Sequence, residues 1–394
     1  MIGYAIVLAV AVIATAAMTP VLMWIAPRVG AVAIPSARSV HLRPMPSLGG
    51  VAMFIGFLAA MATASQMRQF REMFVGTSEG VGIVLAAGVM VAIGALDDLR
   101  DVSPPAKIAG QVFSGSLLSL FGTTMLYFRV PFARFDYIVL SPDLAPIVTV
   151  VTVVVMANAM NLIDGLDGLA AGIALIAGFA LFLYSDRLFK AGLLEGSNLG
   201  PLIAIIIVGV CAGFLPFNFN PARIFMGDAG SMFLGLLLAV CTITIGGRTA
   251  DQFSGQTYFF FAPLFIPIVI LGVPLIDTGF SFIRRLVRRQ SFAVADKDHL
   301  HHRLMRLGHG PRRAVGILWV WTAVLSALVL LPTFTGRGNA IVPVGVVALA
   351  LVLYAFFHPG LRSAREAAEI AHHPSVSGRS ADEVVDLVAR RNKR

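Results

Sequence analysis

The chain has 394 residues, of which 57% are hydrophobic and 13% charged, and its mean hydropathy is +0.84. An ordinary soluble domain carries about 25% charged residues, so the composition excludes a soluble globular protein and indicates a membrane protein. The net charge of +9 does not indicate nucleic acid, because the positive residues concentrate at the borders of apolar runs, where anionic lipid and membrane insertion explain them.

Apolar runs long enough to cross a bilayer recur along the whole chain. A spanning helix needs roughly 20 mostly apolar residues, and the Gly and Ala content of these runs, without alternating polarity, favours helices over barrel strands. We therefore predict an all-α integral membrane protein, with one membrane-embedded domain at 1–357 and a polar cytoplasmic tail at 358–394. The eleven predicted spans are 2–26, 49–66, 80–96, 106–122, 144–160, 168–184, 199–216, 229–246, 258–281, 314–332 and 340–357.

Positive charge segregates between the two sides of this predicted bundle. Of the 30 Lys and Arg residues, 22 fall in one set of loops and the tail, and 8 in the opposite loops. Because cytoplasmic loops hold the excess, we expect the N-terminus outside and the C-terminus in the cytoplasm. The cytoplasmic loops expected to form an active site are 27–48, 97–105, 161–168, 217–229 and 282–313.

Acidic side chains gather at the cytoplasmic borders of the predicted spans. Asp97 and Asp98 end the third span, Asp164 and Asp167 lie between the fifth and sixth, and Asp228 precedes the eighth. A charge at the centre of a spanning helix costs about 2.5 to 3.5 kcal/mol, so acids beside such runs need a reason. Five carboxylates on one face would repel one another, and a divalent cation is the simplest explanation.

Two polar motifs surround these acids. In the segment from Asn161 to Gly168, Asn161, Asp164 and Asp167 recur three residues apart and share one side of a helical turn; an ordinary polar turn is the alternative. In the segment 218–231, glycine residues lie at the start of the predicted eighth span. A helix N-terminus there favours an anion and Asp228 can hold a cation, the alternative being that Asp228 is a simple N-cap.

A basic and histidine-rich stretch lies in the longest predicted loop. His299, His301, His302 and Arg303 follow closely on one another. Because this stretch contains no cysteine and carboxylates are available nearby, these side chains are better suited to bind a phosphate than zinc. The alternative is a solvated basic loop at the membrane surface.

Taken together, the motifs resemble the polyprenyl-phosphate N-acetylhexosamine-1-phosphate transferase family, which includes WecA-type enzymes and MraY. The resemblance covers residues 1 to about 357. The separated histidines are more similar to the WecA-type branch than to the uninterrupted triplet of MraY. The matching pieces are Pro46 to Gly50, Asp97-Asp98, Asn161 to Gly168, Asn218 to Ser231, Asp277 before a basic border, and His299 to Arg303.

The resemblance implies a reaction and a set of site residues. The enzyme would transfer a HexNAc-1-phosphate group, with GlcNAc-1-phosphate as the favoured one, from a UDP-sugar to undecaprenyl phosphate and release UMP. The reaction would take place at the inner membrane, as the first membrane step of cell-envelope polysaccharide synthesis. Mg2+ is the implied cofactor, with Mn2+ as a substitute; Asp228 would bind it, and Asp98 and Asp164 are further candidate ligands. The implied catalytic residues are Asp97, Asp98, Asp228, His301 and His302. The implied substrate-binding residues are Ser47, Lys107, Asn161, Asp164, Asp167, Asn218, Phe225, His299 and Arg303.

Three alternatives stay open at the level of sequence. Acids near spanning helices also mark ion-coupled transporters, although transport sites lie near the bilayer midplane and these acids lie at one border. Direct attack by the carrier phosphate and a covalent intermediate on Asp97 or Asp98 are both compatible with the motifs. The donor sugar, the pathway and the oligomeric state, with a homodimer as one option, are not readable.

Overall fold

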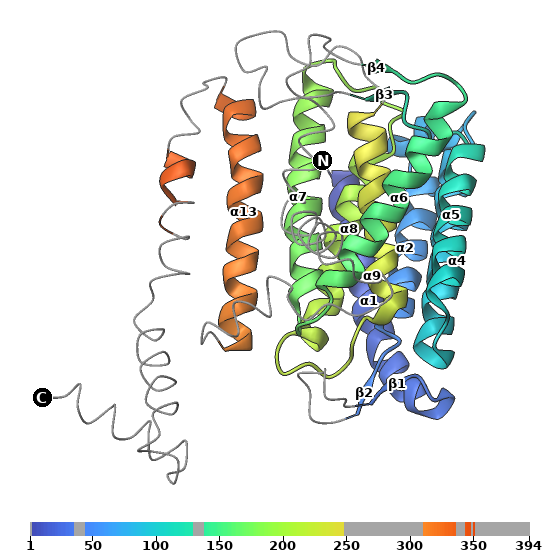
Figure 1. Cartoon of the computed structure of the whole chain (residues 1–394). Helices are drawn as coiled ribbons and strands as arrows, with labels where there is room; N and C mark the ends of the chain where they lie inside the picture. The colour runs from blue at the N-terminus through green and yellow to red at the C-terminus, as the bar shows by residue number, and fades with distance from the viewer. Residues whose placement is uncertain are drawn as a thin grey trace, which may run out of the picture.

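The computed structural model describes residues 2–34, 44–128, 138–247, 310–335, 343–347 and 350. Within them, long helices run side by side as a bundle (Figure 1). A short 3-10 turn, η1 (Arg68–Phe70), and α3 (Arg71–Phe74) connect α2 to α4. The long helices are α1 (Ile2–Val29), α2 (Gly49–Gln66), α4 (Glu79–Arg100), α5 (Pro104–Leu120), α6 (Leu144–Ile163), α7 (Leu169–Lys190), α8 (Gly200–Asn218), α9 (Gly227–Cys241) with its π-helical continuation η2 (Thr242–Gly246), and α13 (Pro311–Thr335).

Two short hairpins close opposite ends of the bundle (Figure 1). Strand β1 (Val32–Ala33) pairs antiparallel with β2 (Met45–Pro46), Val32 lying opposite Pro46. Strand β3 (Tyr127–Phe128) pairs antiparallel with β4 (Ile138–Val139), Tyr127 lying opposite Val139. The end that carries β1 and β2 is the end at which the predicted site residues gather.

The helices confirm a multi-pass membrane protein. Among the described residues, eight helices are long and apolar enough to cross a membrane: α1, α2, α4, α6, α7, α8, α9 with η2, and α13. Helix α5 has 17 residues and packs against α4 and α6. The total of eleven spans stays a prediction, because 258–281, most of 340–357, residues 282–309 and the tail 358–394 lie outside the described residues.

Several helices extend beyond the predicted ends of their apolar runs, among them two that carry predicted site residues. Helix α4 continues to Arg100 and α6 to Ile163, so Asp97, Asp98 and Asn161 are helical residues, where the sequence predicted loops. Hydropathy reports the part of a helix that lies in hydrocarbon, whereas the backbone hydrogen bonds continue into the polar border. The polar side chains therefore project from ordered helix ends.

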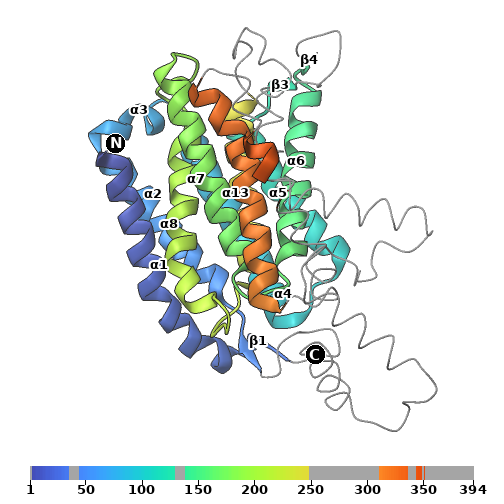
Figure 2. The ribbon, with the colours of Figure 1, turned by 90° about the vertical axis from the view of Figure 1, so that its left-hand side faces the viewer.

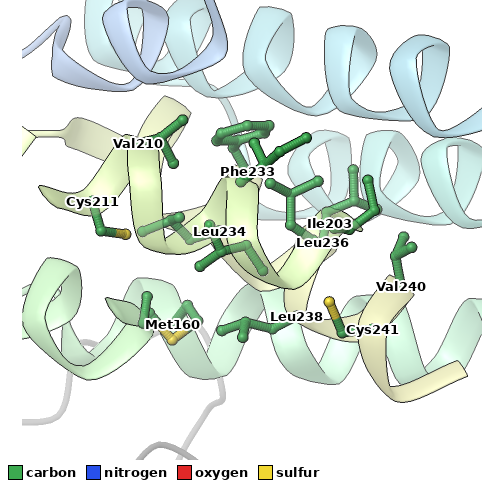
Figure 3. Packing of buried hydrophobic residues seen from close by; sticks show 14 of the residues in the cluster. Met160, Ile203, Val210, Cys211, Phe233, Leu234, Leu236, Leu238, Val240 and Cys241 are labelled. Atoms are coloured by element: carbon green, nitrogen blue, oxygen red, sulfur yellow. The ribbon is translucent and has the colours of Figure 1, made fainter. Parts of the chain in front are cut away.

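Helix α9 is the centre of the bundle. Every residue from Ala229 to Gly246 is buried, and the helix packs against α2, α4, α6 and α8. Glycines allow this approach: a Cβ on Gly50 of α2 would lie 2.0 Å from the amide nitrogen of Gly230, and one on Gly94 of α4 would lie 2.4 Å from Cα of Ala229. Apolar side chains of α9 fill the remaining space (Figure 3).

Helix α13 lies along α7 (Figure 2). A Cβ on Gly172 of α7 would lie 2.0 Å from Cε2 of Trp319, whose indole nitrogen donates a hydrogen bond to the carbonyl of Leu169 at 3.4 Å. This packing brings the start of α13 to the polar end of the bundle.

Candidate active site

Four helix ends build the candidate site. Helices α4 and α6 finish there, and α5 and α9 begin there. Helix α9 packs on both α4 and α6, and α5 packs between these two. Polar residues from all four helices therefore meet at one end of the bundle.

A lysine joins two of the predicted acids. The Nζ atom of Lys107, in the first turn of α5, lies 2.6 Å from Oδ2 of Asp97 and 2.6 Å from Oδ2 of Asp228. The side chains of Asp97, Asp228 and Lys107 are 13%, 24% and 26% exposed, so water screens these charges only in part. Hydrogen bonds between charged groups are roughly twice as strong as neutral ones, and the pairing fixes both carboxylates.

The second oxygen of the Asp228 carboxylate is held by α6. Asn161 donates from Nδ2 to Oδ1 of Asp228 at 2.8 Å and to Oγ of Ser231 at 3.1 Å. The Ser231 hydroxyl in turn donates to the carbonyl of Gly227 at 3.1 Å. The carboxylate of Asp228 is thus oriented from two sides, with access left at the polar end.

Asp98 binds different partners from those of Asp97. Its carboxylate accepts the backbone amide of Asp228 at 3.1 Å and that of Ala229 at 3.4 Å. A carboxylate at a helix N-terminus satisfies free amides and is favoured by the helix dipole. Asp98 of α4 therefore caps α9 from outside.

The alternative that Asp228 is itself the N-cap is wrong. The N-cap position of α9 is Met226, and Asp228 is the second residue of the helix. Its side chain bonds to Lys107 and Asn161 and not to the first amides of α9. An external cap leaves this carboxylate free to face α5 and α6.

The start of α9 is also bonded to the start of α2. The amide of Phe225 donates to the carbonyl of Pro46 at 2.8 Å, and the amides of Gly49 and Gly50 donate to the carbonyls of Phe225 and Met226 at 3.0 and 2.9 Å. The segment around Ser47, a buried residue, is thereby placed beside the approach to Asp228. This bonding brings two predicted substrate-binding residues, Ser47 and Phe225, to the same region.

The predicted residues Asp167 and Asn218 organise the neighbouring loops. Asp167 accepts Nδ2 of Asn220 at 2.8 Å and the amide of Ala222 at 3.0 Å through its Oδ2 atom. Asn218 accepts the amide of Gly168 at 3.0 Å and donates to the carbonyl of Ile224 at 2.9 Å. Both side chains hold the loop between α8 and α9 against the start of α7.

The same loop is tied to α13. Arg312, in the first turn of α13, donates from Nε to Oδ1 of Asn220 at 3.1 Å. The predicted residues His299, His301, His302 and Arg303, together with Asp277, lie outside the described residues.

Asp164 follows the last residue of α6 and has an unusual environment. Burial raises the pKa of its carboxyl group to about 8, and the negative charges of Asp228 and Asp167 add to the rise. Near neutral pH this acid therefore holds a proton that a cation would displace, since a positive charge favours the ionised form.

Comparisons with known proteins identify the family of the chain. The glycosyl transferase family 4 model matches residues 81–246. A decaprenyl-phosphate N-acetylglucosaminephosphotransferase of Mycolicibacterium smegmatis is 34% identical, covering 86% of this chain and 85% of that protein. Its Mycobacterium tuberculosis counterpart is 35% identical over 87% and 86%, and a probable undecaprenyl-phosphate N-acetylglucosaminyl 1-phosphate transferase of Bacillus subtilis is 34% identical over 84% and 86%.

The chain belongs to this family of polyprenyl-phosphate N-acetylglucosamine-1-phosphate transferases. The matched residues 81–246 run from α4 to the end of η2. They contain all the acids and amides that surround Asp228. The family relation and the placement of these acids at helix ends do not favour the transporter alternative.

The donor set in this polyprenyl-phosphate transferase is compatible with Mg2+. Mg2+ at phosphate-transfer sites is commonly held by one or two carboxylates together with substrate phosphates. Asp228 and Asp164 supply oxygen donors. Burial is the main cause of the raised pKa of Asp164, the negative charge of Asp228 adds to it, and a cation would favour the ionised form of both carboxylates. Among the described residues no group of three or more acids, His or Cys forms a metal cluster, and Asp98 is engaged with backbone amides.

Sequence reasoning did not assign roles to three residues of this site. Ser231 holds Asn161, and Gln111 and Asn158 hydrogen-bond to each other one turn deeper. A signal for the last two was present, since polar side chains inside a spanning helix almost always face the bundle interior.

Proposed function

We propose that the protein transfers GlcNAc-1-phosphate from UDP-GlcNAc to undecaprenyl phosphate, giving undecaprenyl-pyrophosphoryl-GlcNAc and UMP. The names and coverage of the relatives support the GlcNAc-1-phosphate and polyprenyl-phosphate parts of this reaction. The observation that carries the proposal is the cluster of Lys107, Asn161 and Asp228 at the polar end of a membrane-spanning bundle. A lipid phosphate and a soluble nucleotide sugar can meet only at such a border.

The proposed chemistry exchanges one pyrophosphate linkage for another. An oxygen of the carrier phosphate attacks the phosphorus that bears the sugar, a new P–O bond forms, and the bond to UMP breaks with its electron pair remaining on the UMP oxygen. A phosphate monoester is largely ionised at pH 7, so a strong base is unnecessary and we favour direct attack over a covalent aspartyl intermediate. The enzyme must mainly align and neutralise two anionic groups.

The side chains at the site suit these needs. Lys107 supplies a positive charge next to Asp228, Asn161 fixes the orientation of that carboxylate, and Asp98 holds α9 in place. We assign Mg2+ to Asp228, with Asp164 as a second carboxylate; when bound, the ion would neutralise phosphate charge and withdraw electrons from phosphorus. His301 and His302 stay proposed phosphate-binding groups.

Phosphorus labelling tests which bond breaks. With the label on the sugar-bound phosphorus of UDP-GlcNAc, we expect it in a lipid pyrophosphate, and we expect UMP as the released nucleotide. Excess UMP should return the labelled sugar phosphate to nucleotide, because the two linkages are similar in free energy. Release of UDP with unlabelled lipid would instead show transfer of the sugar alone.

We also infer that the site faces the cytoplasm at the bacterial inner membrane, where the enzyme would begin cell-envelope polysaccharide synthesis. The support is the concentration of 22 of the 30 Lys and Arg residues on the side of the predicted site. The donor, a soluble nucleotide sugar, would reach the site from that side.

Thiol labelling in intact cells tests this orientation. Ser103, before α5, and Ser197, between α7 and α8, are exposed at opposite ends of the bundle. In a chain without the buried residues Cys211 and Cys241, an impermeant maleimide should label Ser197→Cys and leave Ser103→Cys unlabelled until the cells are opened. The reverse pattern would place the site outside.

A further inference from the structure

A second polar layer lies one helical turn deeper in the bundle than Asp228. Gln111 follows Lys107 by four residues on α5, and Asn158 precedes Asn161 by three residues on α6. Residues three or four apart share a helix face. The pair of Gln111 and Asn158 therefore lies directly below the pair of Lys107 and Asn161.

The deeper layer connects three helices. Asn158 donates from Nδ2 to Oε1 of Gln111 at 2.6 Å and to the carbonyl of Val154 at 2.8 Å. Gln111 donates from Nε2 to the sulfur of Met232 at 3.2 Å, and only 1% of Gln111 is exposed. Met232 follows Asp228 by four residues on α9, so α5, α6 and α9 contribute to both layers, whereas α4 contributes to the upper layer alone.

Burial alone does not explain why amide side chains occupy the positions of Gln111 and Asn158. Leucine or methionine would fill similar space without a polar group to satisfy, and thioether sulfur is a weak acceptor. A directional hydrogen bond, unlike apolar packing, fixes the rotation of one helix relative to another, and buried polar groups can specify register in this way. The placement of Lys107 depends on that rotation, because its Nζ atom must reach carboxylates on both α4 and α9.

We propose that Gln111 and Asn158 are positioning residues that set the rotation of α5 against α6 and thereby hold Lys107 between Asp97 and Asp228. The hydrogen bonds and distances alone support the part of the proposal that concerns the position of Lys107. The effect of that position on turnover rests on the proposed function.

Chemical labelling of Lys107 in the purified full-length protein tests the placement. An amine-reactive acylating reagent must reach the Nζ atom of Lys107, and the two carboxylates that lie 2.6 Å from this atom shield it from the reagent. In Gln111→Met and in Asn158→Leu, mass spectrometry should show acylation of Lys107 at least about threefold faster than in the wild type. Lys190, paired with Asp186 at the other end of the bundle, is the internal reference.

A matched control separates positioning from a general loss of packing. Thr149, buried on the same helix as Asn158, accepts the amide of Met125 at 3.0 Å, and Thr149→Val removes that hydrogen bond far from the site. This control should leave the ratio of Lys107 to Lys190 labelling unchanged. If an apolar variant fails to fold, Gln111→Asn, which keeps the amide but shortens its reach, should show the same rise.

Kinetics provide the second readout. Gln111→Met and Asn158→Leu should lower kcat about tenfold, with KM for both substrates within about twofold of the wild type, because small misplacements of a charged group affect the transition state most. An unchanged labelling ratio in both variants would overturn the inference whatever the activity, and a raised ratio with normal kcat would overturn its catalytic consequence. Absence of a lipid pyrophosphate product from the wild type would contradict the proposed function and leave the labelling result standing.

Discussion

Replacing Asp228 by asparagine should reduce turnover by at least about 10³-fold while the protein still inserts and folds. The substitution preserves shape but removes the negative charge that faces Lys107, whose Nζ atom lies 2.6 Å from Oδ2. An amide nitrogen at that position would place a donor against a donor. It would also remove the carboxylate to which we assign Mg2+, so the remaining activity should respond weakly to added Mg2+.

Asp186 offers a matched control for this substitution. Its carboxylate pairs with Lys190 at 2.7 Å, four residues along α7 at the opposite end of the bundle. Exposed pairs of this kind contribute little to stability, so Asp186→Asn should keep wild-type turnover. Activity is measured as lipid pyrophosphate formation, and thermal unfolding in detergent checks the fold of both variants. Asp228→Asn with wild-type turnover and Mg2+ dependence would refute the assigned role.

Sequence alone predicted which segments are helices because the bilayer imposes a length on apolar runs. It did not predict where the helices end, since α4 and α6 keep their backbone hydrogen bonds beyond the hydrocarbon region. The inference that the acids share one end of the bundle is confirmed for the described residues. Alternation of spans is enough to assign an end, because successive helices cross in opposite directions.

The pairings at the site required the structure. Lys107 and Asp228 are 121 residues apart in the chain, and Asp98 caps a helix 130 residues later. Such contacts depend on how each helix is rotated about its axis, and hydropathy in spans this apolar carries little information about rotation. For that reason, the sequence did not show that Asp97 pairs with Lys107 whereas Asp98 caps α9.

Replacing Gly227 by alanine should lower activity on the order of 10²-fold, because the site has no room for a side chain at the start of α9. Gly227 has φ +67°, and a Cβ there would lie 2.2 Å from Oδ2 of Asp98 and 2.5 Å from the carbonyl oxygen of Ser47. To relieve these contacts, either the cap of α9 or the chain before α2 must shift. Either shift moves Asp228 relative to Lys107.

Gly76 separates this effect from backbone strain. It has φ +81°, and a Cβ there meets nothing within 4 Å, so Gly76→Ala incurs the cost of a left-handed alanine, about 1–2 kcal/mol, without a clash. We expect Gly76→Ala to unfold at a lower temperature but to keep near wild-type turnover while folded. Gly227→Ala should show a similar or larger fall in unfolding temperature and, in addition, the loss of turnover measured on the folded fraction. Equal turnover in the two variants would show that the clash with Asp98 and Ser47 is relieved without moving Asp228, and that the tight packing at Gly227 serves stability alone.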